Sequence, residues 1–242
     1  MPRFKLIIEY DGTGFSGWQI QPDARTVEEE LEKAFSRIVQ QSIDLVGQGR
    51  TDAGVHAKGQ VAHVDVPEGL DMDKLIIGVN GLTNDDVLIV SAEKVSDNFH
   101  ARFDAQSREY VYTLAKSPSP LLSRYSWTLP KACNFSLMQE CAALLNGEFD
   151  FSGFSKFNEE NYTSLCTILV SEFEEMEYVI FYRIRANRFL RNMVRRLIGT
   201  MIQVALGKLS VADFERLLKE PSSDTKTYTA PAKGLVLEKV LY

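Results

Sequence analysis

The chain has 242 residues, 45% of them hydrophobic and 25% charged, so it is long enough to bury a substantial core and has the composition of a soluble globular protein. Its net charge of −6 argues against general affinity for nucleic acid, and no uninterrupted apolar stretch approaches the length needed to cross a bilayer. The three cysteines form no CxxC pair, which argues against a metal site and is typical of a reducing, cytoplasmic location.

The first half of the chain predicts strands that alternate with helices. Residues 3–10 alternate apolar and polar side chains, as a half-buried strand does and a signal peptide does not. Thr26-x-x-Glu29 is a capping box that opens a helix with one apolar face. That face consists of Val27, Leu31, Ala34, Phe35 and Ile38. A strand over 60–66, a helix over 72–80 and a strand over 87–95 complete this half.

The second half repeats this order of elements. We expect a strand over 108–116, a proline-rich surface loop, and a helix that Ser136-x-x-Gln139 caps and Gly147 ends. Strands over 167–175 and 178–186 and a long helix over 188–206 follow. Ser210-x-x-Asp213 then opens a short helix that stops before Pro221, and residues 234–242 form the last strand. The repetition predicts an α+β protein with two related halves, residues 1–105 and 106–242, that share or face across a mixed sheet.

Positive charge is concentrated in one part of the second half. Between Phe181 and Arg196 the chain has no acidic residue and six arginines: Arg183, Arg185, Arg188, Arg191, Arg195 and Arg196. Phosphate contact depends on local potential, so such a surface can hold RNA on an acidic protein. On the predicted long helix, Arg188, Arg191 and Arg195 are spaced i, i+3, i+7 and share one face. Another face carries Phe189, Met193, Leu197 and Met201, which can pack on the sheet.

The most informative stretch runs from Gly49 to Ala57, with the sequence GRTDAGVHA. It places Asp52 between two glycines and beside Arg50, whose permanent charge favours the ionised carboxylate. Glycine adopts backbone angles that other residues avoid, so a tight loop can present the side chain. A held carboxylate can act as a nucleophile, a base or an anionic stabiliser. The alternative is an aspartate that bonds its own backbone in a turn.

Five segments together resemble one known family, the tRNA pseudouridine synthase A family. They are YDGTGFSGWQIQP (residues 10–22), GRTDAGVHAKGQVAHV (49–64), FHARFDAQSREYVY (99–112), ANRFLRNMVRRLIGTM (186–201) and APAKGLVLEKVLY (230–242). They occur in the family's order and span nearly the whole chain. The resemblance implies the family's fold, in which two related α+β halves form a continuous, mostly antiparallel sheet flanked by helices, with a central basic cleft.

The resemblance also implies a set of site residues. The catalytic nucleophile falls on Asp52, and Arg195 is its expected charge partner, with a structural salt bridge as the alternative. Tyr110 is expected to pack against the target base, while Tyr112, on the same strand face, is expected to be structural. Leu235 matches a residue that closes the pocket's apolar wall, and Arg50 one that helps to expel the base. Arg188 and Arg191 are expected to bind substrate.

The implied activity is isomerisation of uridine to pseudouridine at positions 38–40 of the tRNA anticodon stem-loop, by a homodimer without metal or cofactor. The sequence agrees, because it has no P-loop or dinucleotide fingerprint, and His56 and His63 have no third ligand at suitable spacing. The alternatives are a non-catalytic tRNA-binding or folding protein, which would need the arginines but not Asp52, and a nucleoside hydrolase, which would release free uracil.

Overall fold

The computed structural model describes residues 1–157, 162–221 and 226–242. They form two compact units, one made of Met1–Gln106 with Val236–Tyr242 and the other of Ser107–Leu235. Across the described ranges there are ten strands and five α-helices, which confirms the predicted α+β class.

The sheet of the first unit is built around strand β1 (Arg3–Tyr10), which pairs antiparallel with β3 (His56–Asp65) and with β4 (Val87–Lys94). The short β2 (Leu45–Gly47) is antiparallel to β3, and β10 (Leu235–Leu241) is parallel to it. The strand β10 explains why Val236–Tyr242 groups with this unit: the chain returns to pair with β3.

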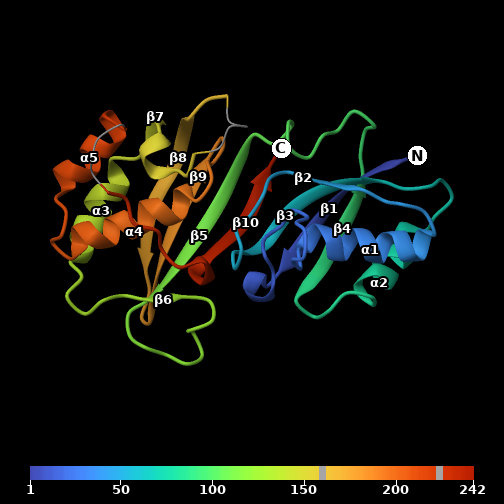
Figure 1. The fold of residues 1–242 in the computed structure, drawn as a ribbon, viewed down its shortest axis with the longest axis horizontal. Helices are drawn as coiled ribbons and strands as arrows, with labels where there is room; N and C mark the ends of the chain where they lie inside the picture. The colour runs from blue at the N-terminus through green and yellow to red at the C-terminus, as the bar shows by residue number, and fades with distance from the viewer. Residues whose placement is uncertain (158–161, 222–225) are drawn as a thin grey trace. The chain divides into compact units, whose positions relative to one another are not determined.

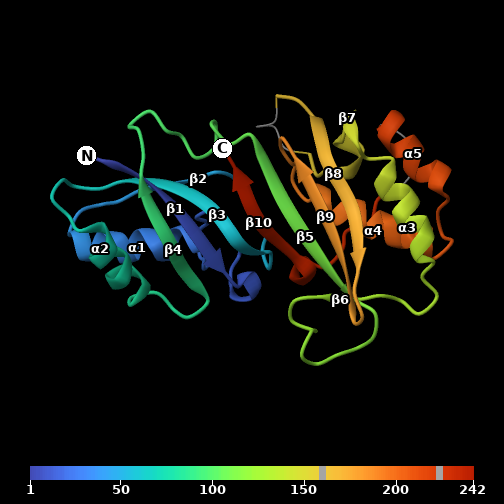
Figure 2. The same cartoon turned by 180° about the vertical axis from the view of Figure 1, so that it is seen from behind.

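Two helices, α1 (Val27–Val39) and α2 (Met72–Asn80), cover one face of this sheet, and Figure 2 shows the strands in front of them. Helix α1 follows the predicted pattern except at Ile38, which is 39% exposed. It starts at Thr26 as predicted, but the predicted capping box is wrong because the Thr26 side chain makes no cap hydrogen bond. Helix α2 matches the predicted range, and Asp71 caps it.

The strands of the second unit are mainly antiparallel to one another. In order across the sheet, its strands are β5 (Ser107–Ala115), β9 (Val179–Ala186), β8 (Leu165–Glu175) and β7 (Gly147–Asp150), with the two-residue β6 (Trp127–Thr128) parallel to β5. Side chains alternate across it: Tyr182 and Ile184 are buried, whereas Arg183 and Arg185 are partly exposed on the other face.

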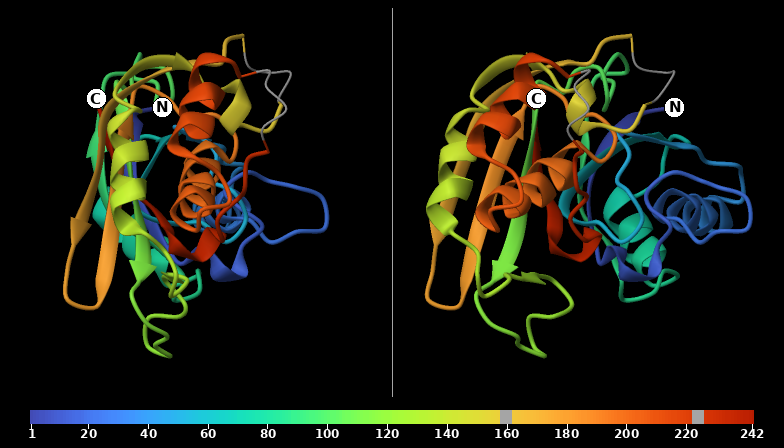
Figure 3. Two further views of the ribbon diagram at one scale, coloured as in Figure 1. Left: turned by 90° about the vertical axis from the view of Figure 1, so that its left-hand side faces the viewer. Right: turned by 60° about the vertical axis from the view of Figure 1, so that its left-hand side comes forward.

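Three helices cover the buried face of these strands, as Figures 1 and 3 show: α3 (Phe135–Ala143), α4 (Met193–Ala205) and α5 (Val211–Lys219). Helix α3 is capped by Asn134, whose side chain accepts from the Ser136 amide, so the predicted Ser136 cap is wrong. Helix α5 has the predicted capping box, in which Ser210 and Asp213 bond each other's backbone amides. No helix in the described ranges is both long and apolar enough to span a membrane.

Candidate active site

The loop that carries Asp52 links β2 to β3 in the first unit. Asp52 is half-buried and Arg50 is exposed. Gly54 adopts a left-handed φ of +76°, and the Val55 amide donates to the Asp52 carbonyl at 3.1 Å, so a tight turn follows the aspartate as predicted. Gly49 does not need its conformational freedom: its φ is not positive, and a Cβ there would have no neighbour within 4 Å. The tight turn therefore lies on one side of Asp52 only.

Two buried glutamines hold the beginning of this loop. Gln60, fully buried on β3, donates from Nε2 to the carbonyl of Gly49 at 3.1 Å. Its Oε1 accepts from the side-chain amide of Gln48 and from the Val61 amide, both at 3.1 Å. Buried polar groups with every bond made fix a unique arrangement. We did not predict this role from the sequence, although a glutamine within the apolar part of β3 was a usable signal.

His56 joins the first turn of the chain to the same region. Its Nδ1 lies 3.0 Å from the Gly12 amide and 3.0 Å from a carboxylate oxygen of Asp11. A neutral ring accepts from Gly12 and a protonated ring donates to Asp11, so His56 links the two segments in either state. His63, seven residues further along β3, accepts from the Ala101 amide at 3.2 Å. Within the described part of the chain, no three His, Cys, Asp or Glu side chains are grouped to hold a metal.

The two tyrosines of β5 lie in the second unit and have different surroundings. Tyr110 is 9% exposed and meets the ring of Phe189 edge-on, with 5.2 Å between centroids. Tyr112 is fully buried and donates its hydroxyl to the Pro231 carbonyl at 2.9 Å, and burial raises the pKa of this phenol. Tyr112 is thus structural, as predicted.

Leu235 follows a single 3-10 turn, η3 (Ala232–Gly234), and is 5% exposed. Gly234 lies against the ring of Tyr112 so closely that a Cβ would come within 2.6 Å of it. The hydroxyl bond from Tyr112 to Pro231 holds the other end of the same turn. Leu235 therefore has a fixed position within the second unit.

Arg195 lies in the first turn of α4. Its Nε donates to the carbonyl of Ala230 at 2.8 Å, and one terminal nitrogen donates to the Asn192 side-chain oxygen at 3.3 Å. The next residue, Arg196, donates to the Ser155 carbonyl at 2.6 Å, and burial lowers the pKa of its guanidinium. The two arginines thus have fixed and separate partners.

The prediction that Arg188, Arg191 and Arg195 share a helix face is wrong. Helix α4 starts at Met193, because Asn192 adopts a left-handed φ of +62° that interrupts helical geometry. Both other arginines precede the helix, Arg188 in irregular backbone and Arg191 in a turn. Of the apolar residues, Met193, Leu197 and Met201 lie on α4 and are buried as expected, whereas Phe189 precedes it.

The six arginines of residues 181–196 do not form one surface. Arg183 and Arg185 lie on the sheet face opposite the helices, and Arg183 bonds the buried carboxylate of Glu109 at 2.8 Å. This pair removes Arg183 from the positive charge that we expected to face RNA.

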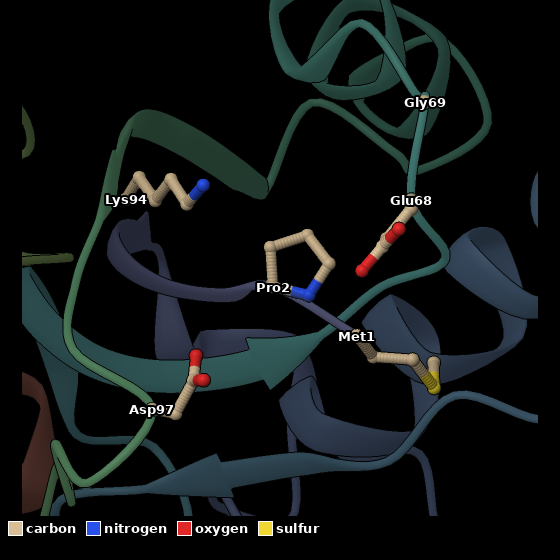
Figure 4. Close-up of a pocket in the computed structure, with 6 residues that line it drawn as sticks. All are labelled: Met1, Pro2, Glu68, Gly69, Lys94 and Asp97. Atoms are coloured by element: carbon tan, nitrogen blue, oxygen red, sulfur yellow. The ribbon is translucent and has the colours of Figure 1, made fainter.

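A shallow pocket of about 360 Å³ lies in the first unit and is lined by Met1, Pro2, Glu68, Gly69, Lys94 and Asp97 (Figure 4). It lies at the beginning of β1, whereas Tyr10, at the other end of that strand, contacts the Asp52 loop. Eight strand residues span about 25 Å, so this pocket is separate from the loop.

Comparison with known proteins shows the class of enzyme. A family model described as tRNA pseudouridine synthase matches residues 6–104 and 141–242. The tRNA pseudouridine synthase A of Chlorobaculum tepidum is 41% identical over 98% of this chain and 97% of its own length. The enzymes of that name from Bacteroides fragilis and Brevibacillus brevis are 38% and 37% identical over 99% and 100% of this chain, and over 96% and 100% of their own lengths. The chain belongs to the tRNA pseudouridine synthase family, which confirms the predicted resemblance and places it among the isomerases.

Solved structures are more distant. The match to a Cbf5-Nop10-Gar1 complex has a TM-score of 0.34 at 10% identity and covers 95% of this chain. The chain spans 56% of the length of the chain that it matches there.

Proposed function

We propose that this protein isomerises uridine to pseudouridine at positions 38–40 of the tRNA anticodon stem-loop, with Asp52 as the nucleophile. The observation that carries the proposal is the full-length match to the family, whose signature loop GRTDAGVHA contains Asp52. The structure supports it, because Asp52 is half-buried on a loop whose flanking residues are held by buried hydrogen bonds.

The reaction needs little beyond a positioned carboxylate and a closed pocket. The bond from ribose C1′ to uracil N1 breaks, the base rotates, and C1′ joins C5. The hydrogen of C5 leaves to solvent as a proton and N1 takes up a proton, so the product is an isomer of uridine. Asp52 could attack C6 of the base, attack C1′, or assist removal of the C2′ proton to form a glycal. In each route the target nucleotide must leave its stack, and the detached uracil must be retained.

The other site residues take roles that their surroundings support. Arg195 is proposed as the charge partner of the Asp52 carboxylate, and its Nε bond to Ala230 gives the guanidinium a fixed starting point. Tyr110 is proposed to hold the flipped base with its ring face, and its contact with Phe189 helps to fix that ring. Leu235 would form the apolar wall.

Three exposed or loop arginines complete the proposed site. Arg50, exposed beside Asp52, would take the space that the base vacates. Arg188 and Arg191 would bind backbone phosphates from the segment before α4. None of these residues is proposed to hydrogen-bond a base edge outside the target nucleotide, so we expect the protein to recognise the shape of the RNA.

The test is tritium release from tRNA labelled with [5-³H]uridine, because bond formation at C5 displaces that hydrogen. We expect release by the wild-type protein and none by Asp52→Ala that still binds tRNA, with Asp44→Asn, an exposed carboxylate nearby, as active as wild type. Binding of a competent anticodon stem-loop without release would contradict the proposal and favour a non-catalytic tRNA-binding protein. Release of free uracil would favour a hydrolase.

We also propose that the protein is a cytoplasmic homodimer. The support is the full-length match to the family and the three cysteines, which are free thiols. Light scattering on the purified chain should give twice the 27.3 kDa mass of one copy, and a single-copy mass at assay concentration would contradict the dimer.

A further inference from the structure

The ring of Tyr10, the last residue of β1, is fixed by its packing. Its side chain is 3% exposed and contacts Phe15 and Trp18, whose ring centroids are 6.4 Å and 6.3 Å away. Both partners belong to the segment that follows β1, and both are themselves buried. The phenol hydroxyl therefore has one position.

That hydroxyl reaches the residue before the proposed nucleophile. The hydroxyl oxygens of Tyr10 and Thr51 are hydrogen-bonded at 2.8 Å, and Thr51 is 7% exposed. The carbonyl of Thr51 accepts from the Trp18 amide at 3.2 Å. Thr51 is thus held through its side chain by Tyr10 and through its backbone by the segment that follows β1.

The contact between this segment and the loop continues past Asp52. The Gly54 amide donates to the Phe15 carbonyl at 3.3 Å. Gly17 has a φ of +102°, and a Cβ at this position would lie 2.6 Å from the Thr51 carbonyl oxygen, so only glycine permits the approach. The loop is therefore held immediately before and two residues after Asp52.

We propose that Tyr10 is a positioning residue for the isomerisation: through Thr51 its hydroxyl fixes the backbone that presents the Asp52 carboxylate. This rests on the proposed function, in which Asp52 is the nucleophile. Asp52 lies in neither a helix nor a strand, so its geometry depends on such side-chain contacts. Misplacing a reacting group by a fraction of an ångström slows the chemical step while leaving substrate binding intact.

The experiment compares two tyrosine-to-phenylalanine variants that lose the same atom. Tyr10→Phe keeps the packed ring and removes the hydroxyl. Tyr182→Phe is the matched control, because Tyr182 is fully buried in the second unit and its hydroxyl bonds that of Ser171 at 2.9 Å. Single-turnover tritium release, tRNA affinity and melting temperature are measured for both.

We expect Tyr10→Phe to lower the single-turnover rate constant roughly tenfold to 100-fold with unchanged tRNA affinity. Tyr182→Phe should lower the melting temperature and leave the rate constant at the wild-type value. Thr51→Val should slow the reaction as much as Tyr10→Phe does, and the double variant should be no slower than either single variant. Thr51→Ser keeps a hydroxyl and should therefore retain most of the wild-type rate.

A Tyr10→Phe protein as fast as wild type, or single effects that multiply in the double variant, would overturn the positioning role. Asp52→Ala, assayed alongside, separates the two proposals. If Asp52→Ala is inactive and Tyr10→Phe is fast, the positioning role alone fails. If Asp52→Ala keeps wild-type activity, the nucleophile assignment fails, and the role of Tyr10 fails with it.

Discussion

Arg195 and Ala230 are joined twice: Nε of Arg195 donates to the Ala230 carbonyl at 2.8 Å, and the Ala230 amide donates to the Arg195 carbonyl at 2.9 Å. Helix α4 and the segment before η3 therefore fix the Arg195 guanidinium together. The segment can approach the helix because Gly199 lies beneath it, where a Cβ would come within 2.2 Å of the Tyr228 carbonyl oxygen.

Gly199→Ala should therefore damage both stability and activity. The added methyl meets backbone, which cannot move aside without shifting the acceptor of Arg195, and we expect a loss of roughly 1–3 kcal/mol in unfolding free energy. Denaturant unfolding and tritium release measure the two effects. Gly81→Ala is the control, since its Cβ would have ordinary contacts of 3.4–3.5 Å. Equal stability of the two variants would contradict the close approach at Gly199.

Gln60→Met should loosen the beginning of the Asp52 loop. The methionine fills the same volume but leaves the Gly49 carbonyl and the Gln48 amide without the bonds that Gln60 makes. Unmade buried bonds cost roughly 1–3 kcal/mol, so the denaturation midpoint should fall. Gln40→Met removes a bond from an exposed amide to the Arg37 carbonyl and should change stability by less than about 0.5 kcal/mol. A Gln60→Met protein as stable as Gln40→Met would show that the buried network contributes nothing.

His63 should make the protein less stable in mild acid. Burial, followed by the positive charges of Arg3 and His100, lowers its pKa to about 4, against the partial opposition of Asp65 and Asp104. An unfolded histidine titrates near 6.5, so between these values the unfolded chain takes up a proton that the folded chain does not. The stability contributed by neutral His63 is complete above pH 6.5, falls as the pH is lowered, and is lost below about 4.

The measurement is the melting temperature from pH 7.5 to 4 for wild type and His63→Asn, whose side-chain oxygen can accept from Ala101 but does not titrate. As the pH falls over this range, we expect the unfolding free energy of the wild-type protein to drop by about 2 kcal/mol more than that of the variant, and its melting temperature to fall further. Parallel curves would mean that His63 takes up its proton equally in the folded and unfolded chains.

Most regular elements could be predicted from periodicity because each has one buried face. The helix over 72–80 matched α2, and the strands over 87–95 and 108–116 matched β4 and β5 to within one residue at each end. The start of α4 was missed because it depends on the left-handed conformation of Asn192, which leaves no periodic signal. The predicted arginine face was lost with it.

The loop of Asp52 was identified from its residue types, whereas its supports were not. Tyr10 is 41 residues before Thr51 and reaches the loop only because β1 and β3 pair, while Gln60 reaches back from β3 to Gly49. Long-range hydrogen bonds of this kind require a known register, which the alternation of apolar residues does not provide.

The predicted starts of α1 and α5 have different outcomes, because of these two helices only α5 has a capping box. At α5, Ser210 accepts from the Asp213 amide at 3.0 Å and Asp213 accepts from the Ser210 amide at 2.9 Å. At α1, Glu29 pairs with Lys33 instead, and the buried Thr26 hydroxyl has no hydrogen-bond partner there.

Ser210→Ala should therefore lower the unfolding free energy by about 1 kcal/mol, while Thr26→Val should leave it unchanged or raise it. Valine has the shape of threonine and suits the extended backbone of residue 26, where φ is −131° and ψ is 156°. Replacing an unbonded buried hydroxyl by a methyl removes a desolvation cost without opening a cavity. Urea denaturation measures the unfolding free energy of both variants. An equal decrease for Ser210→Ala and Thr26→Val would mean that the Thr26 side chain caps its helix in solution.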